Sequence, residues 1–395
     1  MDLADSPEEA AFRAEARAFL EGQDDPRLPD YGDDQIAADV FLERHLVWQR
    51  VLYAGGWAGV MWPREVGGRG CGPIEQIIWN QELARRGVGE SIFLVGTGLA
   101  GPTIIAHGSD AQKQRFLEPL LRGDEIWCQL FSEPGAGSDL AALATRAERD
   151  GADWVITGQK TWCSGGRDAH RGILLARTDP KVPKHRGITY FLLDMASPGV
   201  EVRPLRQMNG GAHFNEVFLN EVRVPDADRL SAVGEGWKAA MTTLTNERMA
   251  IGGLERQFSL EALLEHARSN RDRVDGVLRD QLGELVCWSK CLELLNASVI
   301  TKLARGEMPA AESAVMKLAI ARILSRAGDL GMRLLGPEAL LRRGAWQNAF
   351  LLAPAFHIAG GTDEIQKNLA AERVLGLPAE ERRDRELPFD ELPRS

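Results

Sequence analysis

Residues Ser132–Asp139 read Ser-Glu-Pro-Gly-Ala-Gly-Ser-Asp, and this stretch is the most informative part of the sequence. Its two glycines, Gly135 and Gly137, allow a tight turn and let bare backbone amides approach a ligand closely. Its two serines place hydroxyl groups beside those amides, an arrangement that suits a flat electron-accepting ligand or a phosphate. The alternative reading of the stretch alone is a plain turn that feeds a capped short element.

The composition is typical of a globular protein and argues against several functional classes. The chain has 395 residues, of which 44% are hydrophobic and 26% charged, so we expect two or three domains. A net charge of −10 disfavours a nucleic-acid-binding protein. No apolar run approaches the roughly 18 residues of a membrane span, and the acidic start resembles no signal peptide, so a cytoplasmic protein is expected. The five scattered cysteines and seven histidines show no metal-binding spacing, and we predict reduced thiols and no metal site.

The period of the hydrophobic pattern predicts three domains and a tail. Helical spacing dominates residues 1–124, which begin with the capping box Ser6-Pro7-Glu8-Glu9. Alternating spacing with glycine and proline punctuation covers residues 125–232, and helical spacing returns over residues 233–378. Residues 379–395 form a charged, proline-dotted tail that we expect to be mobile or bound to a partner. The order predicts an α+β fold with an N-terminal helical domain, a middle β-barrel domain and a C-terminal helical bundle.

Particular segments carry these predictions. Strands are expected over residues 154–156, 172–176, 188–193, 200–202 and 217–219. In the bundle, apolar faces are expected from Leu278, Leu282, Leu285 and Leu292, and from Val315, Leu318, Ile323 and Leu324. The stretch Gly96–Gly101 matches the dinucleotide fingerprint, but Pro102 follows at once and residues 109–120 are helical. We therefore interpret these glycines as sites of close helix packing and predict no Rossmann domain.

Five segments in this order resemble the acyl-CoA dehydrogenase family across nearly the whole chain. They are Gly56-Trp57 with 63–70, Ser132–Asp139, Gly158–Ser164, Val222-Arg223-Val224-Pro225, and Gly361-Thr362-Asp363-Glu364-Ile365-Gln366. The resemblance implies an acyl-CoA dehydrogenase-like fold whose C-terminal domain is a four-helix bundle. It also implies an FAD cofactor, an acyl-CoA substrate and electron transfer to an electron-transfer flavoprotein.

The resemblance also implies which residues meet the cofactor. Leu130, Phe131 and Ser132 would line the flavin, and Ser132 would bond its ring edge. Gly137 and Ser138 belong to the same loop, and Ser138 would reach the cofactor or the CoA thioester. Trp162 would pack on the isoalloxazine and Ser164 would bond near its reactive nitrogen, while Thr362 and Glu364 would meet the FAD phosphates. For Trp162 the alternative is a core tryptophan at a strand end.

Removal of a weakly acidic α-proton requires a carboxylate close to it. Many family members carry that glutamate just before the Gly-Thr pair, where this chain has Gly360. A second placement, known in branched-chain and some long-chain members, matches Glu247-Arg248-Met249-Ala250-Ile251-Gly252-Gly253. We therefore assign Glu247 as the base and Arg248 to the substrate site, and the backbone N–H of Gly360 could still serve the thioester oxygen. The alternative is a surface glutamate paired with a nearby arginine.

Two further segments depart from the family pattern. Homo-oligomeric members contact the partner's FAD through an Arg-x-x-Phe segment and a Gln-x-x-Gly-Gly-x-Gly loop. Here the first region reads Arg268–Arg273 without the phenylalanine, and the second reads Arg333–Glu338, in which Pro337 lacks an amide hydrogen and Glu338 would repel a pyrophosphate. We therefore expect a hetero-oligomer (α2β2) with a homologous subunit, with a homotetramer as the alternative.

The expected reaction is α,β-dehydrogenation of an acyl-CoA to the 2-enoyl-CoA. The placement of Glu247 resembles bacterial heteromeric steroid side-chain members of the family, which favours a bulky, branched or steroid-derived acyl chain and a role in lipid or steroid degradation. Alternatives are a related flavin oxidase or monooxygenase, or a non-catalytic subunit that stabilises a homologous partner. His213 could touch the substrate, although a structural turn histidine is the favoured reading.

Overall fold

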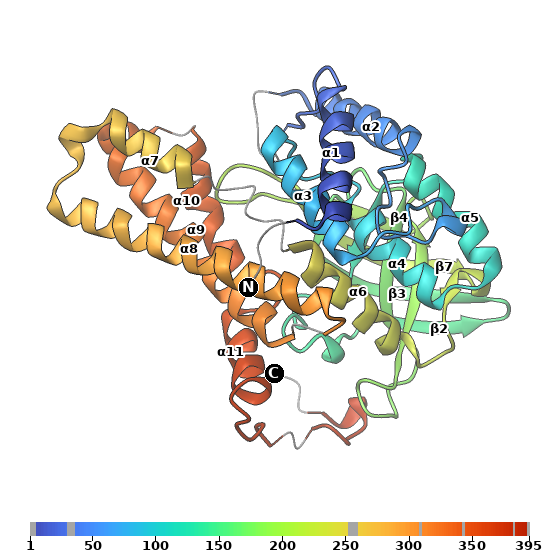
Figure 1. The fold of residues 1–395 in the computed structure, drawn as a ribbon. Coiled ribbons are helices and arrows are strands. Elements are labelled where there is room, and N and C mark those ends of the chain that lie inside the picture. Colours follow the sequence, from blue (N-terminus) through green and yellow to red (C-terminus); the bar gives the residue numbers. More distant parts are fainter. Residues whose placement is uncertain are drawn as a thin grey trace. The chain divides into compact units, whose positions relative to one another are not determined.

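The computed structural model describes residues 5–29, 36–251, 260–307, 310–341, 344–381 and 384–392, with the side chains of 248–251, 304, 310 and 311 outside this description (Figure 1). The chain forms two compact units. The bundle unit comprises residues 1–18, 73–87 and 251–380, and the sheet unit comprises residues 19–72, 88–250 and 381–395. The N-terminal helical segment is thus shared between the two units.

The sheet unit is built on one mixed sheet of eight strands. They are β1 (Trp127–Leu130), β2 (Arg146–Asp150), β3 (Asp153–Ser164), β4 (Arg171–Arg177), β5 (Ile188–Asp194), β6 (Val200–Leu205), β7 (Phe214–Pro225) and β8 (Arg229–Leu230). The order is β6-β7-β3-β2-β4-β5-β8, and β1 pairs in parallel with β4. All five strands expected from the sequence lie within β3 to β7, so the β character of this region is confirmed.

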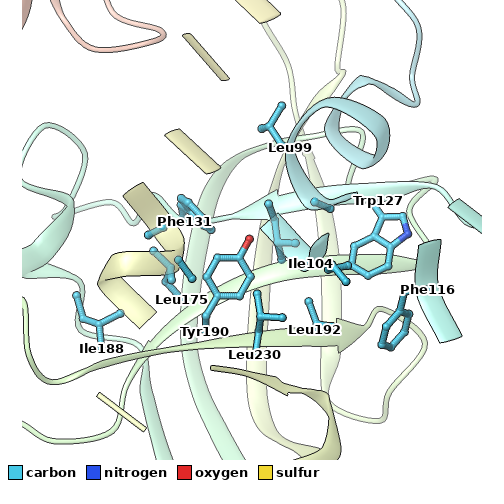
Figure 2. Packing of buried hydrophobic residues seen from close by; sticks show 14 of the residues in the cluster. Leu99, Ile104, Phe116, Trp127, Phe131, Leu175, Ile188, Tyr190, Leu192 and Leu230 are labelled. Atoms are coloured by element: carbon cyan, nitrogen blue, oxygen red, sulfur yellow. The ribbon is translucent and has the colours of Figure 1, made fainter. Parts of the chain in front are cut away.

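Strands β4 and β5 bury apolar side chains on both faces. Ile173 and Leu175 join the cluster that contains Tyr190 and helical residues, whereas Leu174 joins a second cluster formed by strand residues and Met195. Because successive side chains alternate between the faces of a strand, a strand covered on both sides reads as one continuous apolar run. Figure 2 shows Tyr190 beside Phe131 in the first cluster.

Helices cover the face of the sheet that carries Tyr190. The sheet unit contains α2 (Ala38–Ala54), a π-helical turn (Val95–Ala100), α4 (Gly101–His107), α5 (Asp110–Arg122) and most of α6 (Gly236–Ile251). The start of α5 is fixed by a capping box, in which Ser109 and Gln112 satisfy each other's backbone N–H. Helices α4, α5 and α6 each contribute residues to the shared cluster, through Ile104, Leu120 and Ala239 respectively.

The dinucleotide-like glycines serve helix packing, as predicted. A Cβ on Gly101 would lie 1.9 Å from the ring of Trp62, and one on Gly96 would lie 3.3 Å from Leu120. The Trp62 indole N–H donates to the carbonyl of Thr97 at 2.9 Å, which seats the ring against this turn. The segment is helical and precedes no strand of a βαβ unit, so the absence of a Rossmann arrangement here is confirmed.

The bundle unit contains most of α1 (Pro7–Glu21), together with α3 (Pro73–Arg86), α7 (Leu260–Ser269), α8 (Gly276–Ala304), α9 (Ala310–Leu335), α10 (Ala345–Phe356) and α11 (Asp363–Arg373). The predicted capping box begins α1, since Ser6 N–H donates to Glu9 and Glu9 N–H donates to Ser6 Oγ. The expected leucine face of α8 is buried. On α9, Ile323 is buried, but Val315 is 42% exposed because its neighbours take the inward positions. None of the described helices has an apolar stretch long enough to cross a membrane.

The described part of the tail, residues 384–392, packs against its own chain. Phe389 N–H donates to the carbonyl of Val182 at 3.0 Å, and Asp390 N–H donates to the carbonyl of Pro180 at 3.0 Å. Both acceptors lie in the loop that joins β4 to β5. The expectation of a mobile tail is therefore wrong for these residues, and the alternative of a partner-bound tail stays a prediction.

Candidate active site

The signature loop, residues 132–139, leaves the carboxyl end of β1 as a tight turn. Glu133 and Ala136 exchange two backbone hydrogen bonds of 3.0 Å each. Neither Gly135 nor Gly137 has a left-handed φ, and a Cβ added to either would meet no atom within 4 Å. The chain's own conformation therefore does not require glycine at these positions. Open space on both residues fits a ligand that lies close to the backbone.

A buried ion pair fixes the base of the signature loop. Lys160 Nζ on β3 lies 2.7 Å from Glu133 Oε1 and 3.1 Å from the carbonyl of Phe131. Glu133 also accepts hydrogen bonds from the backbone N–H groups of Ala144 and Thr145. Burial alone would raise the pKa of Glu133, but Lys160 and these donors outweigh it and hold the pKa below its ordinary value. Burial lowers the pKa of Lys160, and the neighbouring Glu133 carboxylate opposes that shift. The pair joins β3 to the base of the loop.

Trp162 is held in an exposed and strained position beside the signature loop. Thr161 N–H donates to the carbonyl of Ser132 at 2.9 Å, which places Trp162 next to the start of the loop. Trp162 has a φ of 60°, lies at a register shift in the β3–β7 pairing, and is 60% exposed. The core-tryptophan alternative is therefore wrong. A strained, solvent-facing indole is the kind of feature that a flat ligand explains.

Ser164 and His213 lie close to Trp162. Ser164 ends β3 in register with Phe214, whose ring meets the indole of Trp162 edge-on at 5.8 Å between centroids. His213 packs on Phe214 at 4.3 Å, and its Nδ1 lies 3.0 Å from Gln207 Nε2. Burial lowers the pKa of His213 to about 4, so the imidazole is neutral at physiological pH. This placement favours a structural role for His213, through Phe214.

The residues expected to line the flavin differ in how far their side chains are buried. The side chains of Leu130 and Phe131 are buried in the two clusters on opposite faces of the sheet, so they could meet a ligand only through their backbone. Ser132 is half-buried, whereas Gly137 and Ser138 are exposed. The polar groups that face outward are therefore those of the serines and the loop backbone.

Glu247 lies on α6 and reaches towards the strand that feeds the signature loop. Its Oε2 accepts a hydrogen bond from Gln129 Nε2 on β1 at 3.2 Å. Gln129 stands three residues before the loop, so the carboxylate is placed at the same edge of the sheet as Ser132. Glu247 is half-buried. The side chain of Arg248 lies outside the described residues.

A buried hydroxyl cluster anchors α6 one helical turn before Glu247. Thr243 Oγ1 lies 2.8 Å from Thr103 Oγ1 on α4 and 3.1 Å from the hydroxyl of Tyr190 on β5. All three side chains are fully buried, and burial raises the pKa of Tyr190, so the phenol is neutral. Residues four apart lie on the same face of a helix. The cluster therefore sets the direction in which Glu247 points.

The bundle unit carries the remaining expected residues. Gly360 and Gly361 have φ values of 66° and 91°, a region that disfavours any side chain, and Gln366 Nε2 donates to the carbonyl of Gly360 at 2.9 Å. Thr362 caps α11 by accepting from Ile365 N–H. Glu364 is exposed in the first turn, where its carboxylate would repel a phosphate. The N–H groups of Asp363 and Ile365 already donate to the His357 carbonyl and to Thr362, so the backbone N–H of Glu364 is better suited to a phosphate than its side chain is.

A polar network organises the turn before α11. His357 Nδ1 lies 2.6 Å from Asp363 Oδ2, and its Nε2 lies 2.8 Å from Ser325 Oγ. Lys317 Nζ donates to the other oxygen of Asp363 at 2.9 Å. Burial would raise the pKa of Asp363, but His357 and Lys317 outweigh it and lower the pKa. The network holds the glycine turn at residues 360–361 in place.

The two departing segments also lie in the bundle unit. Arg268 lies in the last turn of α7 with an exposed guanidinium, and Arg273 Nη1 donates to the carbonyl of Leu334 at 2.8 Å. Gln281 on α8 accepts a hydrogen bond from Arg333 on α9, so the two side chains bind each other within this chain. Pro337 and Glu338 lie in the 3-10 turn Gly336–Leu340, which has no glycine run.

Several residues of the sheet-unit site were not assigned from the sequence. They are Gln129, Glu133, Lys160, Thr243 and Phe214. Glu133 lies inside the segment 132–139 and Lys160 lies inside the segment 158–164, both of which carry the family resemblance. A charged residue at an inward-facing position of a strand, such as Lys160, is a signal for a buried ion pair. Gln129 and Thr243 carry no such signal, because their roles come from the crossing of α6 over β1 and β5.

Taken together, the sheet-unit residues fit a flat, electron-accepting ring. An exposed indole offers a face, unobstructed glycines offer room, and Ser132, Ser138 and Ser164 offer hydrogen-bonding groups. A carboxylate on α6 lies within reach of the same strand end. The donor set therefore fits FAD.

Comparison with known proteins agrees with this geometry. Family models match at residues 6–124 (acyl-CoA dehydrogenase, N-terminal domain), 128–222 (middle domain) and 234–375 (C-terminal domain). The chain is 39% identical to the acyl-CoA dehydrogenase IpdE1 of Mycobacterium tuberculosis, covering 93% of this chain and 98% of the relative. It is 43% identical to the acyl-CoA dehydrogenase FadE34 of the same organism over 80% of this chain, and the match spans 44% of that relative's length.

Solved structures with the same fold include two whose names each join two proteins. A chain of the "Tcur3481-Tcur3483 steroid ACAD" matches with a TM-score of 0.84 and 29% identity, covering 96% of this chain and all of that one. A chain of the ChsE4-ChsE5 complex from Mycobacterium tuberculosis matches with a TM-score of 0.79 and 28% identity, with the same coverage. The three domain matches and the 39% identity over nearly the full chain show that this protein belongs to the acyl-CoA dehydrogenase family of oxidoreductases.

Proposed function

We propose that this chain catalyses the FAD-dependent α,β-dehydrogenation of an acyl-CoA thioester, with Glu247 as the base. The observation that carries the proposal is the 3.2 Å hydrogen bond from Gln129 Nε2 to Glu247 Oε2. It aims the carboxylate at the strand end from which the signature loop departs. Gly360, where other members carry a glutamate, has a left-handed φ and no side chain, so a base must come from elsewhere.

Glu247 would remove the α-proton of the thioester. Gln129 donates to Oε2 and fixes the orientation of the carboxylate, which is proposed as the group that takes the proton. As the α-proton leaves, negative charge develops on the thioester oxygen, and a hydrogen-bond donor there lowers the barrier. The N–H of Gly360 stays our candidate for that donor, and Arg248 stays a candidate for the substrate site.

Ser132, Ser138, Trp162 and Ser164 are the residues that would hold the isoalloxazine, together with the backbone of residues 130–137. When bound, FAD supplies an acceptor for the hydride that leaves the β-carbon. Trp162 would stack on the ring and exclude water from one side. The backbone at Thr362 and Glu364 would serve the phosphates.

The substrate and partners are proposed from the relatives. The "steroid ACAD" in the name of one structural match supports a bulky or steroid-derived acyl chain. The paired names of both matched structures support an α2β2 assembly with a homologous subunit. An electron-transfer flavoprotein is the proposed acceptor, and the cytoplasm is the proposed location.

The test is the variant Glu247→Gln, which removes the base and keeps the shape of the side chain. We expect turnover of acyl-CoA, in the assembled complex, to fall by about 10²–10⁴-fold, the size of a general-base contribution. Flavin content and thermal stability should stay unchanged. Glu235→Gln, an exposed glutamate just before α6, is the matched control and should retain full activity.

Near-normal turnover in Glu247→Gln would remove the base assignment. In that case a non-catalytic role beside a homologous subunit would become the better reading. If an acyl-CoA reduces the flavin of the wild-type protein and peroxide then forms rapidly in air, a flavin oxidase on the same fold would be favoured instead.

A further inference from the structure

The C-terminal tail reaches the signature loop through two separate contacts. Its described residues, 384–392, pack on the loop between β4 and β5, where Pro388 and Pro183 form an antiparallel bridge. Backbone bonds from Phe389 and Asp390 to that loop hold the tail in register. The tail is therefore a built part of the sheet unit, and its side chains occupy defined positions.

The first contact passes through Arg177, a buried residue at the end of β4. The ring of Phe389 covers the guanidinium of Arg177, with 3.5 Å between the guanidinium carbon and the ring centroid. On its other sides the guanidinium donates to the carbonyls of Ala141 at 2.7 Å and Leu143 at 3.0 Å. These carbonyls belong to the segment that directly follows the signature loop. Phe389 thus covers a buried cation that holds the segment after the loop.

The second contact passes through Lys184, whose side chain is 8% exposed. Its ammonium donates to Asp139, the last residue of the signature loop, at 2.7 Å, and also donates to Asp384 of the tail. Two carboxylates from distant parts of the sequence therefore share one ammonium. Because Lys184 is largely desolvated, both pairings are less screened than pairs on the open surface.

We propose that Asp384 and Phe389 are positioning residues: the tail holds the signature loop, through Lys184 and Arg177, in the shape that receives the cofactor. The part of this inference that concerns FAD rests on the proposed function. Loss of Phe389 would expose Arg177 to water and weaken its hydrogen bonds to the carbonyls of Ala141 and Leu143. Loss of the Asp384 charge would leave Lys184 with one carboxylate instead of two.

The experiment compares full-length variants in the complex as purified. Phe389→Ala and Asp384→Asn test the two contacts, and Phe389→Trp restores a ring over Arg177. Glu386→Gln, an exposed acid in the same tail, is the matched control. Hydrogen–deuterium exchange in peptides covering residues 132–143 reports on the loop, and flavin fluorescence gives the dissociation constant of FAD.

We expect Phe389→Ala to speed exchange in residues 132–143 and to weaken FAD binding by about tenfold, with Phe389→Trp restoring both. Asp384→Asn should act in the same direction, and Glu386→Gln should act on neither. Asp384 is 42% exposed, so this variant keeps the test decisive if Phe389→Ala fails to fold.

If hydrogen–deuterium exchange in residues 132–143 is unchanged in both test variants, the inference is overturned, whatever the dissociation constant of FAD in those variants. If the wild-type complex binds no FAD in this chain, the proposed function fails. Exchange in the loop would still decide whether the tail positions it.

Discussion

At the scale of single residues, the candidate site depends on side chains that are fully buried behind it. Thr243 is the clearest case, because its hydroxyl is buried between Thr103 and Tyr190, one turn before Glu247. Replacing it with valine keeps the volume but removes one hydrogen-bond partner from each of two buried hydroxyls, of which Thr103 keeps its bond to the carbonyl of Leu99. The hydrogen bonds among these three hydroxyls therefore fix the direction of α6 and also contribute to the stability of the fold.

We expect Thr243→Val to lower the free energy of unfolding by about 1–3 kcal/mol, the cost of leaving buried polar groups unsatisfied. The rate of α-proton removal should fall as well, since the anchor of Glu247 is loosened. Thr245→Val, on the exposed side of the same helix, is the matched control. Denaturant unfolding of both variants checks the prediction, and equal stability of the two would contradict it.

His213 gives the sheet unit a pH dependence whose sign is fixed by burial. Its folded pKa is about 4, below its ordinary value of 6.5, so the unfolded chain takes up the proton first as the pH falls. Stability contributed by the neutral ring is present above pH 6.5 and is lost as the pH falls from about 6.5 towards 4. We expect His213→Gln to flatten this part of the curve of stability against pH. A difference curve without slope between pH 4 and 6.5 would show that His213 is not the group responsible.

At the scale of elements, α1 and α3 are joined by one buried carboxylate. Glu82 on α3 lies 2.9 Å from Arg17 Nη2 and 3.3 Å from Arg13 Nη1 of α1, and 2.8 Å from Arg85 Nε of its own helix. The hydrogen bond from Arg17 lowers the pKa of Glu82 to about 2. Burial opposes this shift, and Arg85 and Arg13 add to it. Stability from this cluster is therefore full above pH 4.5 and is lost as the pH falls towards 2.

Glu82→Gln should destabilise the chain by about 1–3 kcal/mol, because it removes the charge that three arginines share, while Arg17 and Arg85 are more than 40% exposed and can be solvated instead. The loss should show as a lower unfolding midpoint at pH 7 and a weaker response to acid below pH 4.5. Glu8→Gln, an exposed glutamate on α1, should have little effect. An acid response in Glu82→Gln equal to that of wild type would assign the acid sensitivity elsewhere.

Local signals predicted the elements that carry their own patterns. The capping box at Ser6 and the apolar run of β5 needed no knowledge of distant contacts. β2 reads Arg-Ala-Glu-Arg-Asp and buries only Ala147, so it has no alternation and exists through pairing with β3. The position of Glu247 could be predicted from the resemblance, but its partner Gln129 could not, since the two are 118 residues apart.

At the scale of the whole molecule, the bundle unit is poorly equipped to complete a second copy's cofactor site. In the turn Gly336–Leu340, Pro337 lacks an N–H and Glu338 adds negative charge. Arg333 is engaged by Gln281 of the same chain. These features contrast with the intact signature loop of the sheet unit, and they support the proposal that a different kind of subunit completes each cofactor site.

We therefore expect this chain to assemble with a homologous subunit and to carry full flavin only in that complex. The measurement is co-purification with candidate homologous subunits, with the mass of the complex from light scattering and the FAD content per chain from absorbance. The chain expressed alone should bind FAD weakly, since no copy of it can donate the missing amides to a neighbour. Glu338→Gln removes the repulsive charge but not the proline, and should improve flavin retention of the lone chain only slightly. A homotetramer of this chain alone, with one tightly held FAD per subunit and full turnover, would contradict the prediction.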